Sequence, residues 1–235
     1  NEILDNCQTE EERKRTEELI RPILRGRDIK RYGYEWAELW LIATFPSRHY
    51  NIEDYPAVKQ YLLSFGIERL EQTGKVHNVN GERIKSRKKT NNKWFETQDS
   101  ISYWEDFFKP KIIYPNMTKY MPFAYDNQGY LTNQKCFIMT GVHLPYLTAF
   151  LNSNIFKICY RDCFPELQGG TRELSKIFFE NIRIPQIDKL IEYDIENMLE
   201  DAQLGNDYAD LRIDKALIMC LSLQEYETFI LNYQI

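Results

Sequence analysis

Residues 109–141 constrain the fold more than any other stretch, because short apolar runs alternate there with turn-forming residues. Ile112–Tyr114 forms one apolar run, and Pro115 ends it. Met121–Tyr125 and Phe137–Met139 form two further runs, with an Asn-Gln-Gly turn signal between them. Short apolar runs bounded by such residues are typical of β-strands joined by tight turns. The stretch therefore predicts two or three short strands of one sheet.

Polar side chains between these runs allow two interpretations. Basic and amide side chains at strand ends are suited to contact with DNA. They are equally typical of the solvated rim of a half-buried sheet. The residues concerned are Lys111, Asn116, Lys119, Asn133, Gln134 and Lys135. Asn116 and Lys119, beside the predicted strand break, are the candidates for DNA contact in this stretch.

Amphipathic helices are expected on both sides of this sheet region. A chain of 235 residues with 43% hydrophobic residues can bury a sizeable core, and its many Tyr and Phe residues suit sheet faces. Thr9 is expected to cap the first helix, with Glu12 at the capping-box position. Helices are expected over 9–20, 53–73 with a break near Gly66, 144–161, 186–204 and 211–233, and further strands over 38–45 and 178–185. The predicted fold class is α/β (α+β), with a mixed, mainly antiparallel sheet, flanking helices and a C-terminal helical tail.

Charge is distributed unevenly along the chain, whose formal net charge is −5. Residues 1–18 hold seven acids against three bases, a net charge of −4, and residues 186–235 hold eleven acids against three bases, a net charge of −8. Residues 19–185 therefore carry a net charge of +7. A basic middle with acidic ends indicates a core that binds a polyanion, although the same asymmetry also arises by chance on a solvated surface.

Two basic segments in the middle could contact nucleic acid. The first is a turn around Gly26, before the strand expected over 38–45, and the second is a polar insert at 74–93. Arginine and lysine bind phosphates; Asn pairs with adenine, and Arg or Lys with guanine. Both segments could equally be solvated surface with their cations paired to local acids. The turn supplies Arg25, Arg27, Lys30 and Arg31, and the insert supplies Arg83, Lys85, Arg87, Lys88, Lys89, Asn91, Asn92 and Lys93.

No residue pattern in the chain supports catalysis or metal binding. Five cysteines occur without a Cys-x-x-Cys pair, which predicts reduced thiols in a cytoplasmic protein. Glu105 and Asp106 lack the spacing to the following lysines that metal-dependent cleavage requires, and Gly169-Gly170 lacks the context of a nucleotide-binding loop. No apolar stretch is long enough to span a membrane, and the charged N-terminal residues argue against a signal peptide. Because the chain begins with Asn1, we expect it to be part of a longer protein.

Several segments, taken in order, resemble one protein family. RPILRGRDIKRYGY, from Arg21, resembles the entry motif of the TaqI-like C-terminal specificity domain of restriction-modification methyltransferases. WFETQDSISYWEDFFKPKIIYP, from Trp94, resembles the family segment that runs into a Lys-Pro-Lys-Ile-Ile strand. LTAFLNSNIFKICYR and FFENIRIP resemble its Leu-Asn-Ser helix and closing strand, and IDKALIMCLSLQEYETFI resembles the helical tail that often follows. The resemblance covers most of residues 19–230.

This resemblance implies a target-recognition domain for double-stranded DNA. Its parent would be similar to type IIG or Eco57I-like enzymes, which methylate adenine with S-adenosylmethionine. The catalytic Asn-Pro-Pro-Tyr motif of the family does not occur in the sequence, so the cofactor is expected on a methyltransferase domain of the same chain or of a separate subunit. We divide the chain into an N-terminal linker helix (1–20), the DNA target-recognition domain (21–185) and an acidic helical tail (186–235).

The candidate DNA contacts fall into two groups under this interpretation. Phosphate contacts position such a domain, and base-edge contacts specify the sequence. Phosphate contacts are expected from Arg25, Arg27, Lys30, Arg31 and Lys119. Base-edge contacts are expected from Arg87, Lys88, Lys89, Asn91, Asn92 and Arg172, with Lys85, Lys93 and Asn116 as further DNA-contacting candidates.

Two alternatives stay open from the sequence. The chain could be one recognition module of a type I specificity subunit, with its acidic helices as a spacer to a second module. It could also be a protein-interaction domain whose basic loop binds an acidic partner. The acidic C-terminal helices themselves are compatible with a docking bundle and with helices packed on their own domain.

Overall fold

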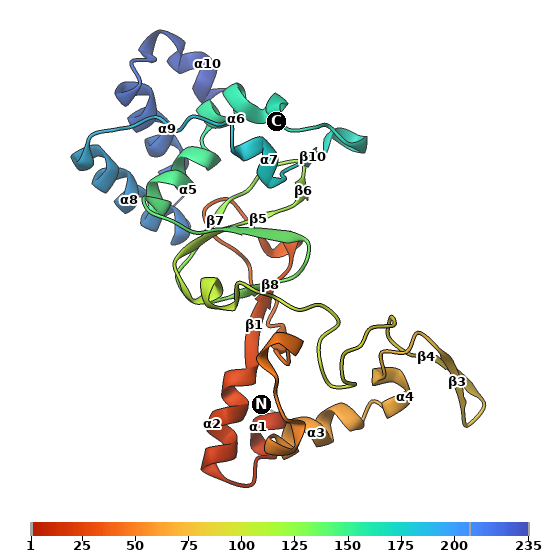
Figure 1. The fold of residues 1–235 in the computed structure, drawn as a ribbon. Coiled ribbons are helices and arrows are strands. Elements are labelled where there is room, and N and C mark those ends of the chain that lie inside the picture. Colours follow the sequence, from red (N-terminus) through yellow and green to blue (C-terminus); the bar gives the residue numbers. More distant parts are fainter. Residues whose placement is uncertain (1, 207, 235) are drawn as a thin grey trace. The chain divides into compact units, whose positions relative to one another are not determined.

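The computed structural model describes residues 2–206 and 208–234, which fold into two compact units. Unit 1 comprises Asn1–Pro22 and Trp40–Trp104, and unit 2 comprises Ile23–Leu39 and Glu105–Ile235. Among the described residues, ten α-helices and several short, mostly antiparallel sheets confirm the predicted mixed α/β class (Figure 1). The units divide the chain at other residues than the three segments predicted above, and that division stays a prediction.

Over its described residues, unit 1 combines four short helices with short strands and has a small core of its own, in which Leu19, Val58 and Phe95 are buried. Thr9 caps the first long helix as predicted, because its hydroxyl accepts a hydrogen bond from the Glu12 backbone N–H at 3.1 Å. The elements of unit 1 are α1 (Glu2–Asp5), α2 (Glu10–Leu19), the first part of β1 (Ile20–Leu24), β2 (Trp40–Ile42), α3 (Pro56–Leu63), α4 (Ile67–Leu70), β3 (Val76–Val79) and β4 (Glu82–Lys85), with 3₁₀ turns η2 (Pro46–Arg48) and η3 (Ile52–Asp54).

The predicted sheet region forms a three-stranded antiparallel sheet in unit 2. β5 (Lys111–Pro115) is the central strand, between β7 (Ala124–Asp126) and β9 (Cys136–Met139). These three strands confirm the prediction, although the second begins at Ala124 rather than Met121. Met121 has a φ of 50°, which lies outside the range of a β-strand.

Two shorter pairings flank this sheet within unit 2. β8 (Leu131–Thr132) runs parallel to Ile23 and Leu24 at the end of β1. β6 (Met117–Thr118) pairs antiparallel with β10 (Arg172–Glu173). The Asn133 N–H donates to the Leu24 carbonyl oxygen at 3.0 Å and the Asn116 N–H to the Lys135 carbonyl oxygen at 2.9 Å, so the end of β1 and the turn after β8 lie close to the end of β5.

The C-terminal helices pack in the same core as this sheet. Ile195 and Leu217 are completely buried in one cluster with Ile112 of β5 and Phe150. Of the two interpretations of these helices, packing on their own domain is therefore the one observed. The helices of unit 2 are α5 (Leu144–Asn152), α6 (Asn154–Tyr160), α7 (Lys176–Phe179), α8 (Lys189–Gln203), α9 (Ala209–Cys220) and α10 (Glu227–Leu231), and its 3₁₀ turns are η1 (Gly26–Asp28), η4 (Trp104–Phe108), η5 (Arg161–Cys163), η6 (Gln168–Gly170) and η7 (Gln224–Tyr226).

Several predicted elements differ from the observed ones. The helix expected over 144–161 is divided at Ser153, whose hydroxyl accepts a hydrogen bond from the Phe156 N–H at 3.1 Å and so caps α6. The prediction of a strand over 178–185 is wrong, because α7 ends at Phe179 and the described residues 180–185 form no strand. Gly66, with a φ of 87°, separates α3 from α4, as predicted. No helix in the described ranges has the length and apolar character needed to cross a membrane.

Candidate nucleic-acid interface

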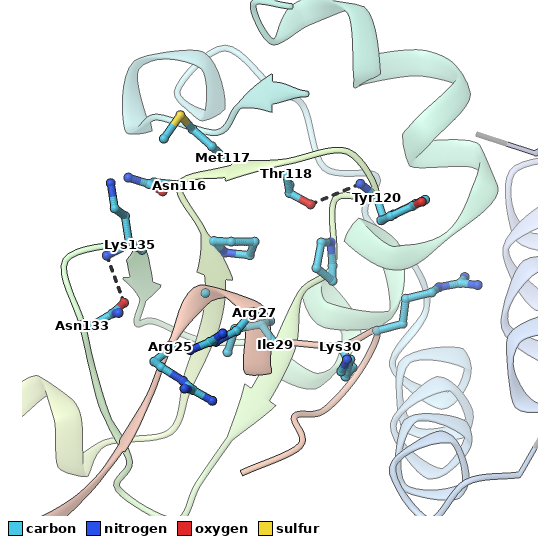
Figure 2. A pocket seen from close by; sticks show the side chains of 14 residues that line it. Arg25, Arg27, Ile29, Lys30, Asn116, Met117, Thr118, Tyr120, Asn133 and Lys135 are labelled. Atoms are coloured by element: carbon cyan, nitrogen blue, oxygen red, sulfur yellow. Dashed lines mark hydrogen bonds between the residues drawn. The ribbon is translucent and has the colours of Figure 1, made fainter. Parts of the chain in front are cut away.

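The candidate site is an open groove in unit 2, where three segments that are distant in sequence meet (Figure 2). These segments are the turn from Arg25 to Arg31, residues 115–122 around β6, and Asn133 with Lys135 between β8 and β9. The groove has a volume of about 680 Å³. In this groove the predicted basic turn lies against the sheet region. Their proximity does not follow from the sequence alone.

An internal clamp shapes the basic turn. The buried Asp28 carboxylate accepts hydrogen bonds from the Arg25 backbone N–H at 2.8 Å and from the Arg25 guanidinium at 2.8 and 3.0 Å. The Asp28 N–H donates back to the Arg25 carbonyl oxygen at 2.9 Å. The Arg25 guanidinium lowers the pKa of the Asp28 carboxyl, so the clamp is ionised at neutral pH. Arg25 is thus held in the wall of the groove by an internal partner.

Gly26 allows the turn to lie close to the opposite wall. A Cβ atom on Gly26 would be 3.3 Å from the Lys135 carbonyl oxygen and 3.5 Å from the Pro115 Cβ. That wall is itself fixed by the backbone, because the Asn116 N–H donates to the Lys135 carbonyl oxygen at 2.9 Å. The Lys135 N–H in turn donates to the Asn133 side chain at 3.0 Å. These backbone contacts hold the polar residues of the groove in place.

The groove is strongly cationic. Among its described lining residues none is acidic, whereas five carry positive charge. A concave surface lined by one sign of charge concentrates ions of the opposite sign. The arrangement therefore suits a polyanion such as a nucleic-acid backbone. The positive residues are Arg25, Arg27, Lys30, Arg31 and Lys135.

Arg31 is tied to a polar cluster among the helices of unit 2. Its guanidinium pairs with the Asp210 carboxylate and donates to the Asn152 carbonyl oxygen at 2.8 Å. A second pocket holds Arg31 and Asp210 together with Lys157 and Asp214. Burial raises the pKa of Asp214 to about 6 and lowers the pKa of Lys157 to about 8. Arg31 is consequently less available to an external anion than its exposed neighbours.

Arg27 and Lys135 are the cations best placed to meet a phosphate. Both are exposed, and in the part of the chain that the structure describes their side chains make no hydrogen bond or ion pair. The Lys30 ammonium lies 3.3 Å from the exposed Glu35 carboxylate, a surface pair that water screens strongly. A phosphate can bind these three side chains without breaking a buried contact.

Neutral residues extend the groove beyond its cations. Tyr120 is 63% exposed, and the Lys119 ammonium lies 5.8 Å from the centre of its ring. Thr118 Oγ1 accepts hydrogen bonds from the Tyr120 N–H at 3.1 Å and the Met121 N–H at 3.3 Å, which fixes the bend after β6. An exposed ring beside cations can stack on a nucleotide. Lys119 lies next to the lining residues rather than among them, whereas Asn116 lines the groove.

Arg87, which was predicted to read bases, is a structural anchor in unit 1. Its guanidinium donates hydrogen bonds to the carbonyl oxygens of Leu70 at 2.7 Å, Glu96 at 2.9 Å and Trp94. Burial lowers its pKa. The geometry therefore favours a role for Arg87 in holding the 74–93 insert on the rest of unit 1.

The other candidate residues of the insert also divide into side chains engaged within the protein and side chains that are exposed. The Asn92 side-chain amide donates to the carbonyl oxygens of Thr97 and Gln98, both at 2.9 Å. The Lys93 ammonium lies 5.6 Å from the centre of the Phe95 ring. Exposed positions are better placed for an external ligand than Asn92. They are Lys85, Lys88, Lys89, Asn91 and Lys93.

Arg172 is also engaged within the protein. Its side chain is 8% exposed and donates to the Phe164 carbonyl oxygen and to Asp162, both at 3.0 Å. It also pairs with Glu166 at 2.8 Å. Because Arg172 lies opposite Thr118 in the β6–β10 pair, this network supports the bend beside the groove rather than presenting Arg172 to a base.

The groove is also lined by residues outside the candidate DNA contacts predicted from the sequence. Asn133, Lys135, Thr118 and Tyr120 all line it. The polar residues between the second and third apolar runs were a visible signal for Asn133 and Lys135. Nothing in the local pattern, however, showed that their turn lies against Gly26.

The chain matches a known protein family. Residues 21–184 match the family model of the TaqI-like C-terminal specificity domain. All three segments of the groove fall within this match. A comparison with curated proteins found no significant match.

Proposed function

The chain belongs to the family of TaqI-like C-terminal specificity domains, and on that premise we propose that it recognises a specific sequence in double-stranded DNA for a restriction-modification enzyme. The observation that carries this proposal is the cationic groove of unit 2, with five positive lining residues. Phosphate contacts supply most of the affinity of a protein for a duplex and fix its register. The groove provides such contacts on a rigid backbone.

The cations of the groove have two different roles, which depend on whether each is hydrogen-bonded to an acid inside the protein. Arg25 and Arg31 are held by Asp28 and Asp210 and shape the walls. Arg27, Lys30 and Lys135 are exposed and bind phosphate oxygens. Since base identity does not alter a phosphate, this groove positions the duplex, and sequence is read elsewhere on the domain.

In the parent enzyme, we propose, this domain holds the duplex for an adenine-specific methyltransferase of the type IIG or Eco57I-like class. The methyltransferase domain, in the same chain or in a separate subunit, would bind S-adenosylmethionine, the donor of the methyl group. Enzymes that modify a base take it out of the stack, and this requires the duplex to be held on both sides of the target. The residues of this chain bind and orient the DNA.

Fluorescence anisotropy with labelled duplexes tests the proposal directly. The full chain should bind a random-sequence duplex pool with an affinity that falls as salt rises. Replacing Arg27 or Lys135 by Ala should lower the slope of log K against log salt by roughly 1, because one phosphate contact is lost. Lys215→Ala is the matched control: it removes an exposed lysine of α9, outside the groove lining, and should leave the slope unchanged.

Two results would contradict the proposal. Undetectable or salt-insensitive DNA binding, by the chain and by its parent enzyme, would exclude DNA recognition. Capture of an acidic protein that Arg27→Ala and Lys135→Ala abolish, with DNA binding unchanged, would instead support a protein-interaction domain.

A further inference from the structure

A two-stranded ribbon in unit 1 has one face whose side chains are all exposed. β3 and β4 pair antiparallel, with Val76 opposite Lys85 and Asn78 opposite Arg83, and they extend from α4 as a hairpin (Figure 1). The turn at Asn80-Gly81 has φ values of 50° and 86°, as in a type I′ turn. Such a turn sets the register of the hairpin, and so it determines which side chains share a face.

The two faces of this hairpin differ in burial. Directly opposed residues of an antiparallel pair lie on the same face. The inner face carries His77 and Ile84, which are half-buried, and β4 packs against α4. His77 Nε2 lies 3.7 Å from the Glu71 carboxylate just after α4. We call the other side the outer face; its residues are all exposed, and they are Val76, Asn78, Arg83 and Lys85.

The base of the hairpin is held firmly. The Ser86 N–H donates to the Lys75 carbonyl oxygen and the Gly74 N–H to the Arg87 carbonyl oxygen, both at 2.9 Å. The hydroxyls of Thr73 and Ser86 are hydrogen-bonded at 2.8 Å. With the Arg87 anchor described above, these contacts extend the ribbon beyond its paired strands. An isolated two-stranded hairpin is marginally stable in water, so this support presents the outer face in a defined geometry.

We infer that the outer face of the β3–β4 hairpin reads base edges in the major groove of DNA, with Asn78 and Arg83 as the residues that determine specificity. This inference rests on the proposed DNA recognition. Asn can bond bidentately to adenine and Arg to guanine, and an exposed aliphatic side chain such as Val76 can contact a thymine methyl. Lys85 at the end of β4 then meets a phosphate.

The dimensions of the ribbon agree with this assignment. Four strand residues rise about 13 Å, and paired strands lie about 4.8 Å apart. The major groove is about 12 Å wide and about 8.5 Å deep, and it admits a two-stranded ribbon. Because Asn78 and Arg83 are directly opposed, their side chains can reach neighbouring base pairs at the same depth.

Charge favours DNA over an uncharged partner for this face. Lys75, Arg83 and Lys85 stand on the hairpin segment against a single acid, Glu82. Glu82 lies opposite Val79, on the inner side of the ribbon. The outer face is thus free of negative charge, and both of its specificity residues can form paired hydrogen bonds with a base.

The test uses the full chain and a duplex selected from a pool with a randomised centre. Anisotropy then compares the affinity for the selected duplex with that for a scrambled duplex. Asn78→Ala removes the amide, and Arg83→Lys keeps the charge but replaces the planar two-donor fork of the guanidinium by a single ammonium. Each change should reduce the preference by roughly 5- to 150-fold, as expected for the loss of a bidentate base contact. Affinity for the scrambled duplex should stay within about twofold of the wild type, since neither change removes a phosphate-binding charge.

Lys75→Ala is the matched control on the same hairpin. Position 75 alternates to the side opposite the outer face, so this variant should affect binding to the two duplexes equally and keep the preference. A preference that survives both Asn78→Ala and Arg83→Lys would overturn the inference while leaving DNA recognition intact. Absence of binding to either duplex by the wild-type chain would instead refute the proposed function, and this inference with it. Binding of the wild type without any sequence preference would overturn the reading role of the hairpin.

Discussion

Lys111 of β5 and Asp126 of β7 lie opposite each other and form an ion pair whose two side chains are both completely buried. The Lys111 ammonium also donates to the Phe107 carbonyl oxygen at 2.6 Å. The Asp126 carboxylate accepts further hydrogen bonds from the Tyr34 hydroxyl at 2.9 Å and from two backbone N–H groups. Burial lowers the pKa of Lys111, and Asp126 opposes that shift. The pair joins the sheet to the segment that carries the basic turn.

Removing one member of this pair should destabilise the protein strongly. Lys111→Met leaves the Asp126 charge buried without its cation, and such changes cost about 3–5 kcal/mol. Chemical denaturation followed by tryptophan fluorescence measures the free energy of unfolding. The double variant Lys111→Met/Asp126→Leu should recover part of the loss, because no uncompensated charge remains. A single variant as stable as the wild type would show that the pair is not buried in solution.

Because Arg87 is engaged within the protein and its neighbour Lys88 is exposed, we expect changes at the two residues to affect stability and DNA affinity differently. Arg87→Met leaves three carbonyl oxygens without their donor and should lower the free energy of unfolding by about 1–3 kcal/mol. The neighbouring Lys88 is exposed, so Lys88→Ala should keep the stability and reduce DNA affinity modestly. Thermal melting and anisotropy on both variants distinguish the two roles. Equal stability of the two variants would contradict the structural role of Arg87.

The close approach of the turn at Gly26 to the opposite wall should be required for the shape of the groove. Gly26→Ala places a Cβ 3.3 Å from the Lys135 carbonyl oxygen, so the turn or the opposite wall must shift. We expect a loss of about 1 kcal/mol in stability and weaker DNA binding, although no charge is removed. Gly33→Ala is the matched control, because its Cβ would meet no atom within 4 Å. Identical DNA affinity of the two variants would show that the close approach is not needed.

Asp214 predicts a specific dependence of stability on pH. Its pKa is about 6 in the folded protein, chiefly because of burial, and about 3.9 in the unfolded chain. The folded state therefore binds the proton more tightly, and the free energy of unfolding falls as pH rises from about 4 to about 6, by about 3 kcal/mol from this group.

Asp214→Asn isolates that contribution. An Asn side chain can still accept the hydrogen bond that the Asn154 N–H donates to Asp214 at 2.9 Å, but it does not titrate. Urea unfolding of both proteins at several pH values gives the difference in stability, in which the other titrating groups largely cancel. The variant should gain stability relative to the wild type as pH rises through this window. A difference that does not change with pH would exclude a raised pKa at Asp214.

The local pattern was sufficient for the elements whose signals are short in range. The apolar runs at 112–114 and 137–139 form β5 and β9, and Thr9 caps α2. Turn residues and strand periodicity act over a few residues, so they are visible in a sequence. The same kind of local signal failed at 178–185. Phe178 and Phe179 look like part of a strand there, but both pack on the core around α7, where the Phe179 ring lies 5.0 Å from that of Phe164.

The sequence by itself determined the mixed fold class, the basic middle of the chain and the turn that carries Arg27 and Lys30. Only the tertiary structure decided which cations are available to a ligand. Arg31 and Asp210 are 179 residues apart, and Lys111 and Asp126 are 15 apart, yet each pair is in contact. The sequence does not distinguish a solvated charged side chain from one that is paired with an opposite charge. Its role depends on burial and on the nearest acceptor, and long-range packing sets both.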